Sequence, residues 1–179
     1  MQSESADAAR TLAEVDRVRR HTRQALNPIW FSNLVVGVFF AGTALVAAAE
    51  ASVAVTLAYW IGGGLLALGL IVHRYASMER ELGVETRGGD ASTAIVLAMI
   101  AGIVVLNSVA DAGLFAGAAG MVALGYVLRD RIEAAAGVAL AVVAAAVLLL
   151  DPTEPGIWGN LGLGLVLVAA GLAGRAARA

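Results

Sequence analysis

The stretch from Ser52 to Arg74 constrains the fold of this chain more than any other. It carries no charged residue before Arg74, and as an α-helix it would rise about 34 Å, enough to cross the hydrocarbon core of a bilayer. At its centre, Gly62, Gly63 and Gly64 present no side-chain bulk, so a second helix can approach the backbone closely. A segment of this kind is typical of a membrane-spanning helix.

The composition of the whole chain agrees with this interpretation. Of its 179 residues, 60% are hydrophobic and 15% are charged, whereas about a quarter of the residues in a soluble domain are charged. We therefore expect the lipid bilayer to be the main partner of this protein. Cysteine and lysine are both absent, which excludes disulfides, thiolate chemistry and a lysine Schiff base. A net charge of −2 gives no reason to expect nucleic acid binding.

Six apolar segments predict an all-α, polytopic membrane protein with six transmembrane helices arranged as three hairpins. The predicted transmembrane domain covers residues 28–174, with spans at about 29–49, 52–74, 91–107, 114–128, 134–150 and 157–174. Each segment is close to the minimum length for crossing a bilayer. Proline, glycine and aspartate mark the breaks between several of them. Arg129, Asp130, Arg131 and Glu133 are predicted to form a charged connection before the fifth span.

Residues 1–27 are predicted to form a cytoplasmic amphipathic helix or tail, because apolar residues recur at three- or four-residue steps and arginines gather at its end. One interpretation is a helix that lies on anionic lipid or docks a partner. The other, which we favour, is a basic flank that sets topology and a solvated tail. Residues 75–90 are predicted to continue the second span as a cytoplasmic helix and then a linker.

The distribution of charge predicts the orientation in the membrane. With six spans, all twelve arginines fall on one side, in the two terminal segments and in the connections after the second and fourth spans. The other side carries Glu50, Asp111, Asp151 and Glu154 and no basic residue. By the positive-inside rule both termini are cytoplasmic, as in a multi-pass protein of the plasma membrane or bacterial inner membrane. Adding or removing one span would destroy this separation.

Small residues within the spans predict close contacts between helices. The glycines expected to pack are Gly37, Gly62, Gly63, Gly64, Gly102, Gly120 and Gly137. Packing within one monomer is the favoured interpretation, and a homodimer interface is the alternative. Polar side chains within the spans are expected to hydrogen-bond between helices; they are Asn33, Thr43, Thr56, Tyr59, Ser92 and Asn160.

No catalytic residue, cofactor or metal site is predicted, because the sequence has no serine–histidine–acid set, no paired aspartate motif and no nucleotide loop. Near the outer surface, Glu50, Asn107 and Asp111 form a candidate site for a solute or cation, although their spacing is not specific for a metal. His21 and His73 fall at the cytoplasmic face, where they would ligate a metal or haem or, as we favour, act as polar flanks.

Three short motifs carry a resemblance to a known group. The motifs Asn27-Pro28-Ile29-Trp30-Phe31, Tyr59-Trp60 and Glu79–Val84 together resemble a group of uncharacterised, actinobacterial integral membrane proteins with six spans. The resemblance covers the first half of the chain. Members of that group often occur beside winged-helix regulators, which implies a sensing or accessory role and no catalytic residues.

Two functional hypotheses follow. The first is a non-enzymatic membrane protein in a sensing, scaffolding or accessory role, which docks a cytoplasmic partner through residues 1–26 and 75–90. Its predicted contact residues are Leu12, Val15, Tyr75, Met78 and Leu82. The alternative is a small homo-oligomeric transporter or channel for an ion or small solute, with its pathway near Asn107 and Asp111.

Overall fold

The structure, a computed structural model, describes residues 14–15, 29–82, 95–96, 98–99, 102 and 113–177. In this part of the chain the regular elements are helices and there is no β-strand. They follow in the order α2 (Ile29–Ala48), α3 (Val53–Ala58), the π-helix η1 (Tyr59–Gly63), α4 (Gly64–Leu82), α6 (Gly113–Leu128), α7 (Arg131–Leu150) and α8 (Pro155–Ala176). The predicted all-helical class is confirmed.

Four helices in the described part of the chain are long and apolar enough to cross a membrane: Ile29–Ala48, Val53–Met78, Arg131–Leu150 and Pro155–Ala176. Helix α6 is apolar but has 16 residues, a rise of about 24 Å, which is shorter than the hydrocarbon core of about 30 Å. The predicted span 91–107 lies outside the described residues, apart from 95–96, 98–99 and 102. The described helices support a helical membrane protein.

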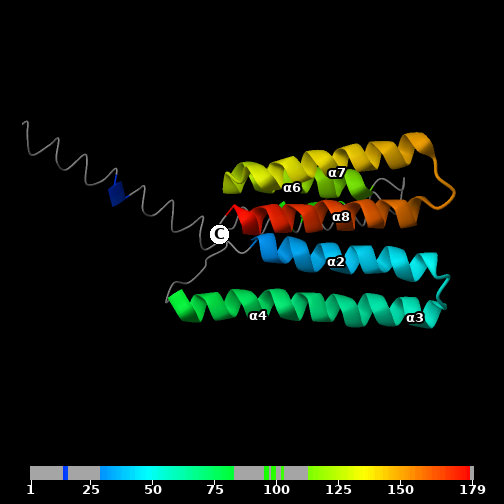
Figure 1. Cartoon of the computed structure of the whole chain (residues 1–179), viewed down its shortest axis with the longest axis horizontal. Coiled ribbons are helices and arrows are strands. Elements are labelled where there is room, and N and C mark those ends of the chain that lie inside the picture. The colour runs from blue at the N-terminus through cyan, green and yellow to red at the C-terminus, as the bar shows by residue number, and fades with distance from the viewer. Residues whose placement is uncertain are drawn as a thin grey trace, which may run out of the picture.

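Short turns join α2 to α3, α6 to α7 and α7 to α8, and each of these turns uses one residue in the left-handed region. The residues are Glu50 between α2 and α3, Arg129 between α6 and α7, and Asp151 between α7 and α8, with φ of 49°, 55° and 42°. Such values are uncommon for residues other than glycine. They reverse the chain within a few residues, so that sequential helices run antiparallel (Figure 1).

The helices pack in an order that differs from their order in the sequence. Helix α4 lies against α2, α2 against α8, α8 against α7, and α7 against α6, and the first four of these helices follow one another across the molecule in Figure 1. The contact between α2 and α8 is the most extensive. The first and last described helices of the bundle are therefore direct neighbours.

Glycine makes the contact between α2 and α8 close. A Cβ atom at Gly164 would lie 2.6 Å from the backbone nitrogen of Ala41, and one at Gly37 would lie 2.8 Å from the carbonyl oxygen of Gly164. Further along, a Cβ atom at Gly171 would lie 2.7 Å from the carbonyl oxygen of Trp30. These positions define an antiparallel seam in which backbone meets backbone, as small residues allow in membrane helices.

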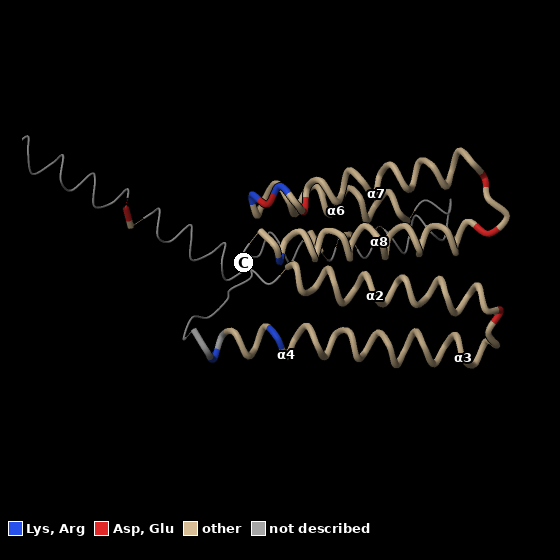
Figure 2. The backbone as a smooth tube through the Cα atoms, in the orientation of Figure 1, with Lys and Arg blue, Asp and Glu red and all other residues tan. Residues whose placement is uncertain are grey.

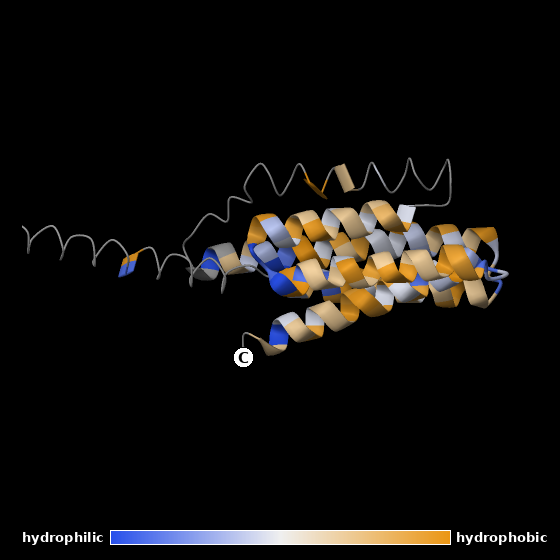
Figure 3. Ribbon diagram, turned by 90° about the horizontal axis from the view of Figure 1, so that it is seen from above, coloured by the Kyte–Doolittle hydropathy of each residue, from blue (hydrophilic) through white to orange (hydrophobic). Residues whose placement is uncertain are grey.

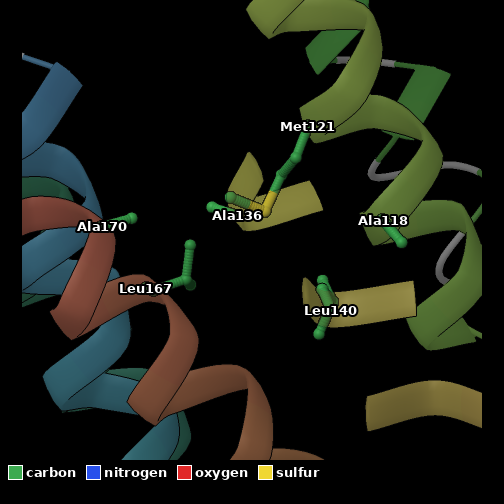
Figure 4. Close-up of a cluster of buried hydrophobic side chains, with 6 residues drawn as sticks. All are labelled: Ala118, Met121, Ala136, Leu140, Leu167 and Ala170. Carbon is green, nitrogen blue, oxygen red and sulfur yellow. The ribbon is translucent and has the colours of Figure 1, made fainter. Parts of the chain in front are cut away.

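The buried hydrophobic core lies among α6, α7 and α8 (Figure 4). It consists of small and medium side chains, two from each helix: Ala118 and Met121, Ala136 and Leu140, and Leu167 and Ala170. Leu140 is 1% exposed. Most other large apolar side chains in these helices point outward, which suits a protein whose outer surface contacts lipid chains.

The arginines of the described helices lie toward one end of the bundle, where Asp130 and Glu133 also lie, and the acidic residues at the opposite end have no arginine beside them. Figure 2 shows Arg residues at one end, where α4 and α8 finish and α6 meets α7, and Asp and Glu alone at the other end. Figure 3 shows hydrophobic residues along the length of the helices, with hydrophilic ones gathered toward the ends. We call these the basic end and the acidic end of the bundle.

Candidate functional site

A buried pair of polar side chains lies near the basic end. The Nδ2 atom of Asn33, on α2, donates a hydrogen bond of 2.7 Å to Oε2 of Glu133, on α7. Glu133 is 3% exposed and Asn33 is 8% exposed. Acidic side chains are almost never fully buried unless they are paired, and within a membrane segment they are a functional hypothesis by default. This pair is the strongest candidate site in the described part of the chain.

The start of α7 explains why Glu133 is buried. Asp130 is the N-cap, and its Oδ1 accepts hydrogen bonds from the backbone N–H of Ile132 at 2.9 Å and of Glu133 at 3.4 Å. A glutamate at this third position often turns back to the N-cap N–H. Here it contacts the neighbouring helix instead. The prediction that Glu133 belongs to a charged connection before the fifth span is therefore wrong, because the helix begins at Arg131.

The sequence holds a signal for this burial. Glu133 is followed at helical spacing by Ala136, Gly137, Leu140 and Ala144, and all of these residues are buried. Aspartate three residues before glutamate is also a usual helix start. Extending α7 back to Arg131 places the carboxyl group on the buried face. The prediction for Asn33, a hydrogen bond between helices, is confirmed.

For an ionised Glu133 carboxylate, the free-energy cost of burial and the favourable interactions that offset it are similar in size. Burying an ionised carboxylate costs several kcal/mol in real proteins. The N-terminus of α7 offsets about 0.3–1 kcal/mol of this cost, or up to about 2 kcal/mol in a partly buried site. A hydrogen bond to a charged group contributes about 1.5–3 kcal/mol. These gains at most balance the cost, so the protonation state of Glu133 depends on small differences.

A second polar contact joins α2 to the α3–η1–α4 helix. The hydroxyl group of Tyr59 donates a hydrogen bond of 2.8 Å to the carbonyl oxygen of Phe39, and the two rings stack with centroids 5.5 Å apart. Trp60 meets Phe39 edge to face. Thr43 donates to the same carbonyl oxygen from within α2, at 3.1 Å. Aromatic side chains thus hold this helix against α2.

The predicted docking residues have different environments. Val15 is exposed, Tyr75 is half-buried and Met78 is buried at 8% exposure. Leu82 is the last residue of α4, but its side chain lies outside what the structure describes, as does Leu12. Among these five, Val15 and Tyr75 offer surface to a partner, whereas Met78 is already covered.

Of the three residues in the predicted outer-face site, the structure describes one. Glu50 is exposed in the turn between α2 and α3, at the acidic end. Asn107 and Asp111 lie outside the described residues. Within the described ranges, no group of three or more histidine, cysteine, aspartate or glutamate side chains is arranged to hold a metal ion.

The predicted packing glycines divide into two groups. Gly37, Gly120 and Gly137 each lie where a Cβ atom would come within 3 Å of a neighbouring helix, and Gly63 and Gly102 lie slightly further from theirs. A Cβ atom placed at Gly62 or Gly64 would have nothing within 4 Å among the described neighbours. At the centre of the Ser52–Arg74 stretch, Gly62 is exposed and Gly64 is half-buried, so neither makes a close contact with a described helix.

Comparison of the chain with protein-family models, curated proteins and solved structures gives no match.

Proposed function

We propose that this chain is a non-enzymatic integral membrane protein with six spans and both termini in the cytoplasm, which docks a protein partner through its cytoplasmic face. A sensing, scaffolding or accessory role fits this arrangement. The separation of charge between the basic and acidic ends (Figure 2) supports the orientation, because arginine-rich ends of spanning helices remain in the cytoplasm.

The observation that carries the proposal is the continuity of the helix from Val53 to Leu82. The residues at both junctions of η1, Ala58 and Gly64, have right-handed helical backbone angles. The helix therefore rises about 45 Å without a break, whereas the hydrocarbon core is about 30 Å thick. Its last turns, which contain Arg74, Tyr75 and Arg80, extend beyond the lipid on the basic side and offer a rigid surface to a partner.

The environment of this helix within the membrane supports the same function. The spanning window in Val53–Met78 contains no buried residue, whereas the windows of the other three spanning helices are 22–28% buried. Among the described helices, the contacts of this helix are with α2. A peripheral helix can tilt or shift at lower cost than one packed on several sides, which suits a helix that responds to a partner.

Site-specific photo-crosslinking tests the docking proposal. A photoreactive residue at Tyr75, in native membranes, is expected to crosslink to one defined protein, and the same residue at the exposed position Leu65 is expected to label lipid alone. Deleting residues 1–20 should weaken the protein crosslink. Identical labelling from both positions, or an unchanged set of interacting proteins after the deletion, would contradict docking through this face.

The buried Glu133 carboxyl group favours a second candidate function, a homo-oligomeric transporter or channel. Acidic groups inside membrane bundles often lie on ion or proton pathways. Purified protein in liposomes would then conduct a solute, and flux would be lost in Asp111→Ala if the predicted outer site lies on the pathway. Absence of flux for protons and monovalent cations would remove this candidate.

A further inference from the structure

The hydrogen bond between Asn33 and Glu133 leaves the carboxyl group with a neutral partner. Asn33 provides one amide donor, and the two backbone N–H groups nearest to it in α7, of Ile132 and Glu133, are bonded to Asp130. Among the contacts that the structure describes, none pairs Glu133 with an arginine. A charge on Glu133 would therefore be held in the bundle without a cation in contact.

The charged groups at this end lie on or beside α6, α7 and α8. Helix α2 contributes no titratable side chain at the pair itself. Arg129 follows α6, Asp130 and Arg131 begin α7, and Arg175 lies in the last turn of α8. The three arginines are exposed, so water screens their charge. Asp130 carries the same sign as an ionised Glu133 and would repel it.

The chemistry of the pair limits what it can bind. One carboxyl group and one amide oxygen provide too few oxygen atoms for Ca²⁺ or Mg²⁺, which take about six or more ligands. A proton needs a single oxygen atom. With a proton on one carboxyl oxygen, the other oxygen still accepts the hydrogen bond from Asn33, so the observed contact is retained.

We propose that Glu133 is a proton-binding site within the bundle, and that the neutral carboxyl group is the form in which α2 and α7 pack most stably around the Asn33 contact. The proton comes from water at the basic end and returns there when the site ionises. Loss of the proton strengthens the single hydrogen bond from Asn33 but leaves a charged carboxylate buried among apolar neighbours, and this desolvation cost weakens the packing of α2 against α7. The site therefore couples proton concentration on the basic side to packing of the bundle, whichever function the bundle serves.

Thermal unfolding in detergent tests this proposal. At low pH the carboxyl group is neutral in both the folded and the unfolded chain, and it makes no difference to stability. As pH rises the unfolded chain ionises freely while the folded chain resists, so the wild-type melting temperature should fall. Glu133→Gln keeps the acceptor for Asn33 and cannot ionise. The difference between wild type and Glu133→Gln should grow by at least about 3 °C between about pH 5 and about pH 9.

Two further measurements keep the test decisive. The exposed Glu154 at the acidic end is the matched control, and Glu154→Gln should follow the wild-type pH profile. Infrared spectra of the wild type should contain a protonated carboxyl band that disappears with rising pH, and this measurement does not depend on any variant folding. The proposal would be overturned if the melting temperatures of wild type and Glu133→Gln changed with pH in the same way, or if the infrared spectra contained no titrating carboxyl band. It would also be overturned if the melting temperature of the wild type depended on Na⁺ concentration instead of pH.

Discussion

Helix α2 contacts a neighbour on each of two sides, and the two contacts use different chemistry. Toward α8 the contact is made by glycines, and backbone lies against backbone at Gly37 and Gly164. Toward η1 and α4 it is made by aromatic rings, with Phe39 stacked on Tyr59. Lipid gives little hydrophobic drive for helix association, so close van der Waals contact determines which neighbour is held firmly. The α8 side is the tight side of α2, and the α4 side is the loose one.

The largest loss of stability is expected when a bulky side chain is placed in the contact between α2 and α8. Gly164→Leu would place a side chain against the backbone of both Gly37 and Ala41, and neither backbone can move without separating the helices. We expect destabilisation above about 3 kcal/mol, at the upper end of overpacking effects, and loss of monodisperse protein after detergent extraction. Normal yield and melting temperature would show that α2 and α8 do not form this seam.

Removing Asn33, the hydrogen-bond partner of Glu133, should cause the next largest loss of stability. Asn33→Leu leaves the buried carboxyl group of Glu133 without a hydrogen bond, which costs about 1–3 kcal/mol. Replacing both residues with leucine should recover much of the loss, because no buried polar group is then left unpaired. A double-mutant cycle on melting temperature measures the coupling. Additive effects of the two single variants would contradict a direct interaction.

A smaller effect is expected on the loose side. Gly42→Ala would place a methyl group on the Tyr59 hydroxyl group, but that group is the end of a flexible side chain and can move. The expected loss of stability is about 1 kcal/mol, because the hydrogen bond from Tyr59 to Phe39 and part of the stacking between their rings would be lost. Tyr59→Phe removes the hydrogen bond alone and should cost about 0.6 kcal/mol. A loss as large as that of Gly164→Leu would show that both sides of α2 are equally tight.

The smallest effect is expected where no neighbour is described. Gly62→Leu matches Gly164→Leu in chemistry, but nothing lies within 4 Å of the Gly62 Cβ position. The melting temperature should change by the equivalent of about 0.5 kcal/mol or less, as for surface substitutions. Crosslinking in membranes provides a second readout. A clear loss of stability together with loss of a crosslinked dimer would indicate that a second copy covers this face.

The comparison also shows how far the sequence predicts the structure. Apolar segments and turn residues predict helices close to those observed, such as 29–49 for α2 (Ile29–Ala48) and 157–174 for α8 (Pro155–Ala176), because helix length and hydrophobicity are local properties. The choice of neighbour is not local. Gly37 and Gly62 both lie within long apolar segments, yet among the described residues Gly37 meets another helix and Gly62 does not. Periodicity shows which residues share a face and leaves open what covers that face.

The candidate site illustrates the same limit. Asn33 is recognisable in the sequence as a polar residue within a span, but its partner lies 100 residues away. The sequence places Glu133 in a connection because charged residues surround it. Its burial depends on where α7 begins, and boundaries of helices are their least predictable feature. The π-helix at Tyr59–Gly63 is not predicted either, since its hydrogen-bond pattern leaves no clear signal in composition.

The contact between α2 and α8 has a consequence for biosynthesis. As the ribosome makes the chain, α2 emerges before α6 and α7, whereas α8, its most extensive neighbour among the described helices, is completed after both. Until α8 is made, the glycine face of α2 lacks the helix that covers it in the described structure, and exposed contact surfaces of this kind favour misassembly. A nascent chain halted before Pro155 would hold the first helix without the last. Closure of the contact between α2 and α8 therefore has to wait until α3, α4, α6 and α7 have all been made.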